Sequence, residues 1–218
     1  MQKDHIIVLA WPEGMTSSAD SWYDYFFAKN GKYRVGHSAL ILVREKDKKC
    51  RFFDFGRYHT PKGQGRVRDI DTDPDLNIKT EVEIIENKIV NISEILQELY
   101  ANRSTNGKGK MYASVIDKIN FKKGYHFAKK LQKKGLINYG PFIYNGTNCS
   151  RFVSSVIRKS NPSIITQIRL KYPFCISPSP KRNISISNNI YFIVSDSKIK
   201  KVKKSLFKSY ITSIEECH

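Results

Sequence analysis

The chain has 218 residues, of which 40% are hydrophobic and 12% aromatic. This length and composition suit one medium-sized domain with a real core and exclude an intrinsically disordered chain. The formal net charge of +18, from 38 basic and 20 acidic residues, favours an anionic polymer or a membrane surface as partner, although lysine-rich solvated faces account for the same charge.

The first part of the chain has the pattern of β-strands. Apolar, β-branched runs predict strands at residues 5–11, 35–43 and 49–56, and the charged segment REKDKK predicts a hairpin turn between the last two. Residues 59–77, which contain proline and glycine, predict a long loop, and residues 80–85 predict a further strand.

Helical periodicity follows. Residues 91–103 predict a helix with Ser93 as N-cap, residues 120–135 predict one that Gly135 closes, and a third should begin near Cys149 and end before Asn161-Pro162. The remaining predictions are a Ser/Pro-rich loop at 175–187, a last strand at 188–195, and a lysine-rich amphipathic helix or basic tail at 197–211.

These elements predict an α+β fold: a small, mostly antiparallel sheet with helices packed on one side. We expect a single catalytic domain over residues 1–195 and a Lys-rich C-terminal extension over residues 196–218. No signal peptide or transmembrane segment is visible, because the run HIIVLAW is far too short to span a bilayer. The sequence therefore predicts a cytoplasmic protein, or one exported without a cleavable signal peptide.

Cys149 raises the question of a reactive thiol. The four cysteines, at positions 50, 149, 175 and 217, match no disulfide framework and contain no C-x-x-C, so we expect neither a metal site nor a cofactor. Cys149 follows the turn-like run NGTN and opens an apolar-periodic segment, which places it in the first turn of a helix. Unpaired N–H groups and the helix dipole favour a thiolate there, and the same groups could bind an oxyanion. From this stretch alone, a small buried packing residue is the better explanation of Cys149.

A nucleophilic cysteine needs a base, usually a histidine. His37 is the strongest candidate, because it follows a glycine at the mouth of the apolar strand GHSALILV. A third residue should orient the ring. If the hairpin turn is centred between residues 45 and 46, Asp54 lies opposite His37, about 5 Å away. His59 is the alternative orienting residue, and Asp54 could instead end its strand and cap a turn.

Two segments resemble a known family. The segment INYGPFIYNGTNCSRFVSSVI (137–157) is similar to the Tyr-Gly and Cys-Ser…Phe-Val region of NlpC-type papain-like cysteine hydrolases, and GHSALILV is similar to their histidine strand. Here the histidine precedes the cysteine, so the resemblance is to the circularly permuted branch, which includes lecithin:retinol acyltransferase-like enzymes. Arg151 replaces the small residue often found after Cys-Ser, and residues 160–218 have no counterpart in the family.

The resemblance implies a cysteine peptidase or amidase that forms a thioester at Cys149, with His37 as its base. The third residue of the family is usually a histidine or another polar residue, so Asp54 is predicted from the hairpin geometry and not from the resemblance. Tyr139, Asn148 and Ser150 are the expected substrate-binding or oxyanion residues. The implied substrates are a peptide, a peptidoglycan-like stem peptide, or an acyl ester for an acyltransferase or thioesterase. A non-catalytic basic module that binds nucleic acid or an anionic surface is the alternative from another class.

Two further loops carry weaker signals. The run DIDTDPDLN (69–77) spaces its carboxylates like calcium ligands but lacks the glycine and the closing glutamate of a calcium loop, so an acidic loop is the better interpretation. The run PKGQGRVR (61–68) could cradle an anionic group, but we expect a mobile loop.

Overall fold

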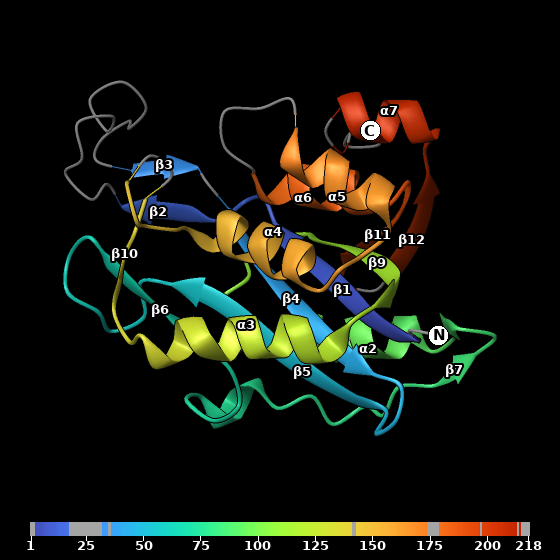
Figure 1. Cartoon of the computed structure of the whole chain (residues 1–218), viewed down its shortest axis with the longest axis horizontal. Helices are drawn as coiled ribbons and strands as arrows, with labels where there is room; N and C mark the ends of the chain where they lie inside the picture. Colours follow the sequence, from blue (N-terminus) through green and yellow to red (C-terminus); the bar gives the residue numbers. More distant parts are fainter. Residues whose placement is uncertain are drawn as a thin grey trace.

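The computed structural model describes residues 3–17, 32–34, 36–140, 143–173, 179–196, 198–212 and 214. Its centre is an eight-stranded sheet with the strand order β10-β6-β5-β4-β1-β9-β11-β12, in which all neighbours are antiparallel (Figure 1). The strands of this sheet are β1 (Asp4–Trp11), β4 (His37–Arg44), β5 (Lys49–Gly56), β6 (Gln64–Arg68), β9 (Met111–Ile119), β10 (Ile137–Asn138), β11 (Ile190–Ser195) and β12 (Lys198–Lys203). Two short hairpins pair β2 (Met15–Ser17) with β3 (Lys32–Arg34) and β7 (Ile84–Ile85) with β8 (Lys88–Ile89).

Six α-helices are seen in the described part of the chain. They are α2 (Ile92–Ala101), α3 (Phe121–Lys133), α4 (Cys149–Lys159), α5 (Ile164–Lys171), α6 (Pro180–Ser187) and α7 (Leu206–Ile211), and two 3-10 turns are η1 (Pro74–Leu76) and η2 (Arg103–Thr105). None of the helices in the described ranges has the length and hydropathy needed to cross a bilayer.

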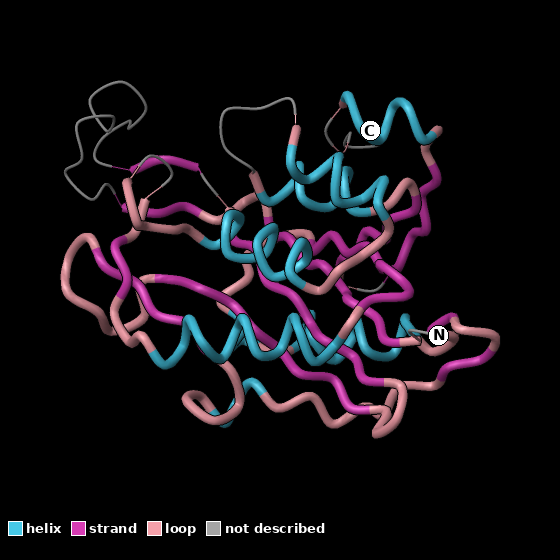
Figure 2. The backbone as a smooth tube through the Cα atoms, viewed as in Figure 1, coloured by secondary structure: helices cyan, strands magenta, loops and turns pink. Residues whose placement is uncertain are grey.

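Both faces of the sheet are covered. On β1, Ile6, Val8 and Ala10 pack into a core with α3, α4, α5 and α6, whereas Ile7, Leu9 and Trp11 pack into a second core with α2. The continuous apolar run of β1 follows from this arrangement, because a strand buried on both faces has no polar alternation. The expectation that all helices lie on one side is therefore wrong. Figure 2 shows cyan helices in front of the magenta strands, and α2 lies on the opposite face.

The helix that begins at Cys149 is held in place by α3. Asn120 caps α3 by accepting a hydrogen bond from the Lys123 N–H, and its own N–H donates to the carbonyl of Ser160 just after α4. Gly124 lets the two helices approach closely, because a Cβ there would lie 2.1 Å from the Ser160 Oγ. The predicted closing role of Gly135 is confirmed by its φ of +70°. At α2 the N-cap is Asn91, so the prediction of Ser93 is wrong.

Several elements differ from the sequence prediction. The predicted loops at 59–77 and 175–187 contain β6 and α6. The predicted strand at 80–85 is reduced to Ile84–Ile85. The lysine-rich segment forms β12 and the short helix α7, and the β11–β12 hairpin crosses the predicted boundary between residues 195 and 196. Strand β9, which pairs with both β1 and β11, was not predicted at all.

Candidate active site

His37 opens β4 directly after a sharp bend in the chain. Gly36 has a φ of +68°, and a Cβ at this position would lie 2.5 Å from the Trp11 carbonyl oxygen. Only glycine fits this conformation and this close approach. The indole of Trp11 stacks on the His37 ring with a centroid distance of 5.9 Å. The bend and the stack together fix the orientation of the imidazole.

Asp54 lies within hydrogen-bond distance of His37, although not through the predicted register. The β4–β5 pairing places Asp54 opposite Ala39, two residues from the expected partner. Because side chains alternate with a period of two, a shift of two residues keeps Asp54 on the same face as His37. The distance from His37 Nε2 to Asp54 Oδ2 is 2.9 Å. The alternative orienting residue, His59, is exposed.

Two residues that sequence reasoning missed surround Asp54. Arg68 on β6 donates from Nε to Oδ1 at 3.0 Å and from Nη2 to Oδ2 at 2.7 Å. The Tyr58 hydroxyl donates to Oδ2 at 2.7 Å, and its ring lies 3.4 Å from the Arg68 guanidinium carbon. Burial opposes ionisation of Asp54, but its bonds with His37 and Arg68 outweigh burial and lower the pKa of the carboxyl. A buried carboxylate requires a cationic partner. Once Asp54 was placed in a buried strand, this requirement could have predicted an arginine or lysine on a neighbouring strand.

Cys149 occupies the first turn of α4, as predicted. The Asn148 side chain accepts a hydrogen bond from the Arg151 N–H at 2.8 Å and so starts the helix. Cys149 is 3% exposed, and the His37 side chain lies near enough to lower the pKa of its thiol. Because Nε2 of His37 faces Asp54, the ring nitrogen left for Cys149 is Nδ1. The structure thus brings residues of β4, β5 and α4 together at one site.

The grouping of Cys149, His37 and Asp54 changes the acidity of both reactive groups. Burial opposes the charged form of His37, but the bonds with Asp54 and Cys149 raise its pKa to about 9. Burial also opposes the thiolate of Cys149, but the His37 bond, the His37 charge and the Ser38 backbone N–H lower the pKa of the thiol below its usual value. Both shifts favour the thiolate–imidazolium pair over the neutral pair.

The other described cysteine lies in a contrasting environment. Cys50 is partly buried on β5, and burial together with the nearby Glu98 raises its pKa to about 12. Cys175, Cys217 and His218 lie outside the described residues. Cys50 therefore offers an internal reference for the reactivity of Cys149.

The expected substrate-binding residues lie around the start of α4. Asn148 is the helix cap, and the Ser150 hydroxyl lies 3.9 Å from the Cys149 sulfur. Ser150 is anchored through its carbonyl, which accepts a hydrogen bond from the Asn183 amide at 2.8 Å. Tyr139 stacks on Phe55 with a centroid distance of 5.7 Å. Their predicted roles toward a substrate remain predictions.

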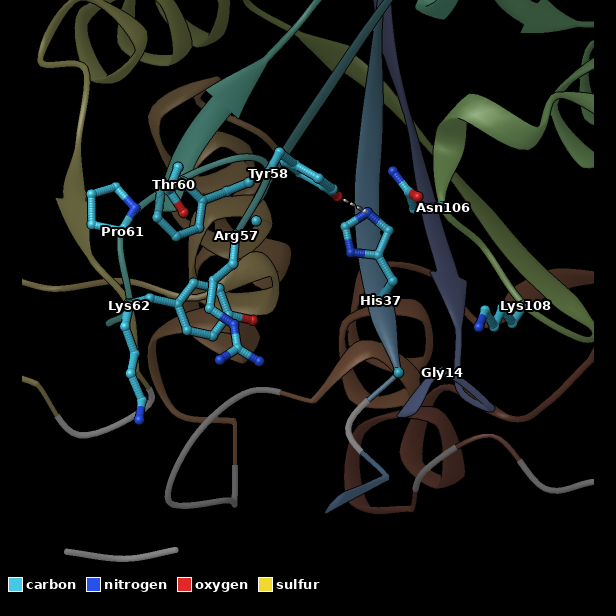
Figure 3. A pocket seen from close by; sticks show the side chains of 13 residues that line it. Gly14, His37, Arg57, Tyr58, Thr60, Pro61, Lys62, Asn106 and Lys108 are labelled. Atoms are coloured by element: carbon cyan, nitrogen blue, oxygen red, sulfur yellow. Dashed lines mark hydrogen bonds between the residues drawn. The ribbon is translucent and has the colours of Figure 1, made fainter. Parts of the chain in front are cut away.

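A cavity of about 570 Å³ opens onto His37. Tyr139 lines it, and Figure 3 shows His37 at its centre with Tyr58 directed toward the ring. The other lining residues are Gly14, Gly36, Phe55, Gly56, Arg57, Thr60, Pro61, Lys62, Asn106 and Lys108. The His37 side chain is 14% exposed, so the ring connects this space with the buried Cys149.

The carboxylates of the acidic segment 69–77 form ion pairs with basic side chains of the same chain. Lys129 donates to Asp69 and Asp71 at 2.7 and 2.8 Å, and Arg66 binds Asp73 through two nitrogens. In the described part of the chain, no three His, Cys, Asp or Glu side chains gather in a way that could hold a metal ion. The carboxylates that resembled calcium ligands thus fasten this segment to α3 and β6.

One comparison with known proteins identifies a family, and another identifies a similar fold. A family model described as type VI secretion system effector TseH-like matches residues 6–164, a range that includes His37, Asp54 and Cys149. Among solved structures, the chain resembles the crystal structure of the type VI secretion system effector TseH with a TM-score of 0.54 and 17% identity, covering 92% of this chain and 98% of that one. At this identity the likeness concerns the fold alone. No curated protein sequence matches the chain significantly.

Proposed function

Because the chain belongs to the family of TseH-like type VI secretion system effectors, we propose that it is an effector hydrolase whose nucleophile is Cys149. The observation that carries this proposal is the grouping of Cys149, His37 and Asp54: His37 Nε2 lies 2.9 Å from Asp54 Oδ2, the thiol has a lowered pKa and the imidazole a raised one. A cysteine that only packs in the core would need neither His37 nor Asp54 beside it. The order of the histidine and cysteine in the chain is that of a permuted papain-like hydrolase.

The reaction follows from the positions of these groups. The Cys149 thiolate attacks the carbonyl carbon of an amide, and the negative charge moves to the carbonyl oxygen. Backbone N–H groups at the start of α4 are the proposed donors for that oxyanion. The His37 imidazolium then gives its proton to the leaving amine, and a thioester on Cys149 remains.

Water completes the cycle. His37, now neutral, takes a proton from a water molecule that attacks the thioester, and the carboxylic acid product leaves with Cys149 restored. Asp54 keeps Nε2 protonated and the ring directed at the sulfur, as the third member of such triads does. Transfer to an acceptor other than water would use the same thioester.

The proposed substrate is a peptide-like amide, of which a cell-wall stem peptide is the leading example. The test uses isolated peptidoglycan and its soluble fragments, with mass spectrometry to detect new amine and carboxyl ends. Cys149→Ala should remove all cleavage while leaving the circular dichroism spectrum unchanged. Cleavage that survives in Cys149→Ala would contradict the proposal, and Cys50→Ala is the matched control that should keep full activity.

A further inference from the structure

Two helices expose apolar side chains where a surface helix usually exposes polar ones. α5 buries Thr166, Arg169 and Leu170, and α7 buries Ser209. Yet α5, its C-cap and α7 hold seven of the twelve large hydrophobic side chains that are exposed in the described part of the chain. A surface helix normally turns its apolar stripe toward the core. We call the outward set the α5–α7 surface, and its members, each between 48% and 74% exposed, are Ile164, Ile165, Ile168, Tyr172, Leu206, Phe207 and Ile211.

Polar contacts on the inner side hold the two helices together. Arg169 of α5 donates from Nη2 to the Ser209 hydroxyl of α7 at 2.7 Å. The Tyr210 hydroxyl donates to the carbonyl of Tyr172 at 2.7 Å, just after α5 ends. Figure 1 shows α7, in red, beside α5 and α6. Because hydrogen bonds fasten α7 here, the apolar side chains on both helices are left on the outside.

The sequence around the α5–α7 surface is strongly basic. Residues 158–212 contain twelve lysines and arginines but only one acidic residue, Asp196. Asp196 accepts a hydrogen bond from Tyr100, which packs with α2 on the other face of the sheet. Lys171 and Lys208, both exposed, are the chain neighbours of Tyr172 and Phe207. A partner that fits this surface therefore offers an apolar layer together with negative charge.

We propose that the α5–α7 surface docks on a lipid bilayer that contains anionic lipids. Such a bilayer places apolar chains directly beneath a layer of phosphate groups. The aliphatic and phenyl side chains enter the boundary between the two layers, and Lys171 and Lys208 remain at the level of the phosphates. A protein partner would need an acidic and apolar groove that matches the shape of both helices, whereas a bilayer needs no such match. The inference goes beyond the proposed function and does not depend on Cys149.

Sedimentation of the full chain with lipid vesicles tests this docking. One set of vesicles contains phosphatidylcholine alone, and the other contains phosphatidylcholine mixed with phosphatidylglycerol. We expect binding to the anionic vesicles that weakens as salt is added, and much weaker binding to the neutral ones. Because the net charge of +18 attracts any anionic surface, variants must show which face makes the contact.

The apolar part of the surface is tested with a double variant, Leu206→Ser with Phe207→Ser. It should weaken binding to the anionic vesicles on the order of tenfold, because it removes apolar area that the bilayer covers. Ile85→Ser with Val90→Ser is the matched control, since these side chains are also exposed but lie at the β7–β8 hairpin. The control should bind like the unchanged chain, and all variants should keep their circular dichroism spectra.

The charged part is tested with Lys171→Gln and Lys208→Gln, each of which should weaken binding to the anionic vesicles about fivefold. Lys49→Gln, an exposed lysine on β5, is the control for charge alone. Equal losses in Lys49→Gln and Lys208→Gln, or no binding to anionic vesicles at low salt, would overturn the proposal. A chain that sediments as a dimer without lipid, and as a monomer after Leu206→Ser with Phe207→Ser, would also overturn it by assigning the surface to a second copy.

Discussion

Arg68 binds Asp54 through two nitrogen atoms, with both side chains almost fully removed from solvent. The same carboxylate oxygen that accepts from Arg68 Nη2 also faces His37 Nε2. The positive charge of Arg68 therefore helps to keep Asp54 ionised at the point where the histidine needs a carboxylate. The orientation of His37 depends on three neighbouring strands, β4, β5 and β6.

Replacing Arg68 by methionine tests the structural side of this relationship. The change leaves a buried carboxylate without its cation, and removal of one partner from a buried ion pair typically costs about 3–5 kcal/mol. We expect a loss of that size in the free energy of unfolding, measured by urea denaturation. Arg51→Met is the control, since Arg51 and Asp47 are each about one quarter exposed and such pairs contribute about 0.2–1 kcal/mol. Equal losses in the two variants would show that Arg68 does not support Asp54.

The pH dependence of hydrolysis follows from the two shifted groups. The lowered thiol pKa sets the acid side of the profile, because protonation of Cys149 removes the nucleophile. The raised His37 pKa, about 9, sets the alkaline side, because a neutral imidazole cannot protonate the leaving amine. We expect kcat/KM to fall above about pH 9, whereas alkylation by iodoacetamide, which needs no acid, should not fall. A parallel decline of both rates would argue against His37 as the proton donor.

Asp54→Asn should move the alkaline side of that profile. The carboxylate raises the pKa of His37, so an amide of the same shape should let that pKa fall from about 9. We expect the decline in kcat/KM to begin at lower pH, with a lower maximum. Asp71→Asn removes a charge that binds Lys129 instead, and it should leave the profile in place. An unchanged alkaline limb in Asp54→Asn would assign the raised pKa to another cause.

The bend before His37 can be tested with a pair of glycines. Gly36 and Gly63 both have positive φ, at +68° and +77°, but only Gly36 is crowded by backbone atoms. Gly63→Ala should cost about 1 kcal/mol of stability for the left-handed conformation alone. Gly36→Ala should cost clearly more and should also slow alkylation of Cys149, because the Trp11–His37 stack must shift. Similar effects on stability and on alkylation would show that the bend does not position the histidine.

The sequence was most informative where both faces of an element are buried. The apolar runs of β1, β4 and β5 predicted their strands almost to the residue, and the Asn148-Cys149 boundary predicted the start of α4. Strand β6 was missed because its sequence is polar and resembles a loop. Its arginines are nevertheless buried or half-buried, where they bind Asp54 and Asp73. Strand β9 mixes polar and apolar residues, and its place beside β1 depends on pairing over a long stretch of chain.

The sequence predicted the three central residues of the candidate site but not the residues that bind Asp54. His37 and Cys149 were identified because a histidine after a glycine and a cysteine after a helix cap are local patterns. The Asp54 prediction used a hairpin register that was wrong by two residues. Asp54 still lies beside His37 because a shift of two residues keeps a side chain on the same face of the strand. Arg68 and Tyr58 depend on the packing of β6 against β5, which no local pattern revealed.

The most direct test of the account compares Cys149 with Cys50 in the native chain at mildly acidic pH, using limiting iodoacetamide and mass spectrometry of each peptide. The lowered pKa of Cys149 and the raised pKa of Cys50, about 12, predict rapid labelling of Cys149 and almost none of Cys50. His37→Gln should slow labelling of Cys149 sharply, because the thiol loses the partner that favours its charged form. Labelling of Cys149 that is no faster than that of Cys50, or that is unchanged in His37→Gln, would contradict the claim that Cys149 is an activated nucleophile.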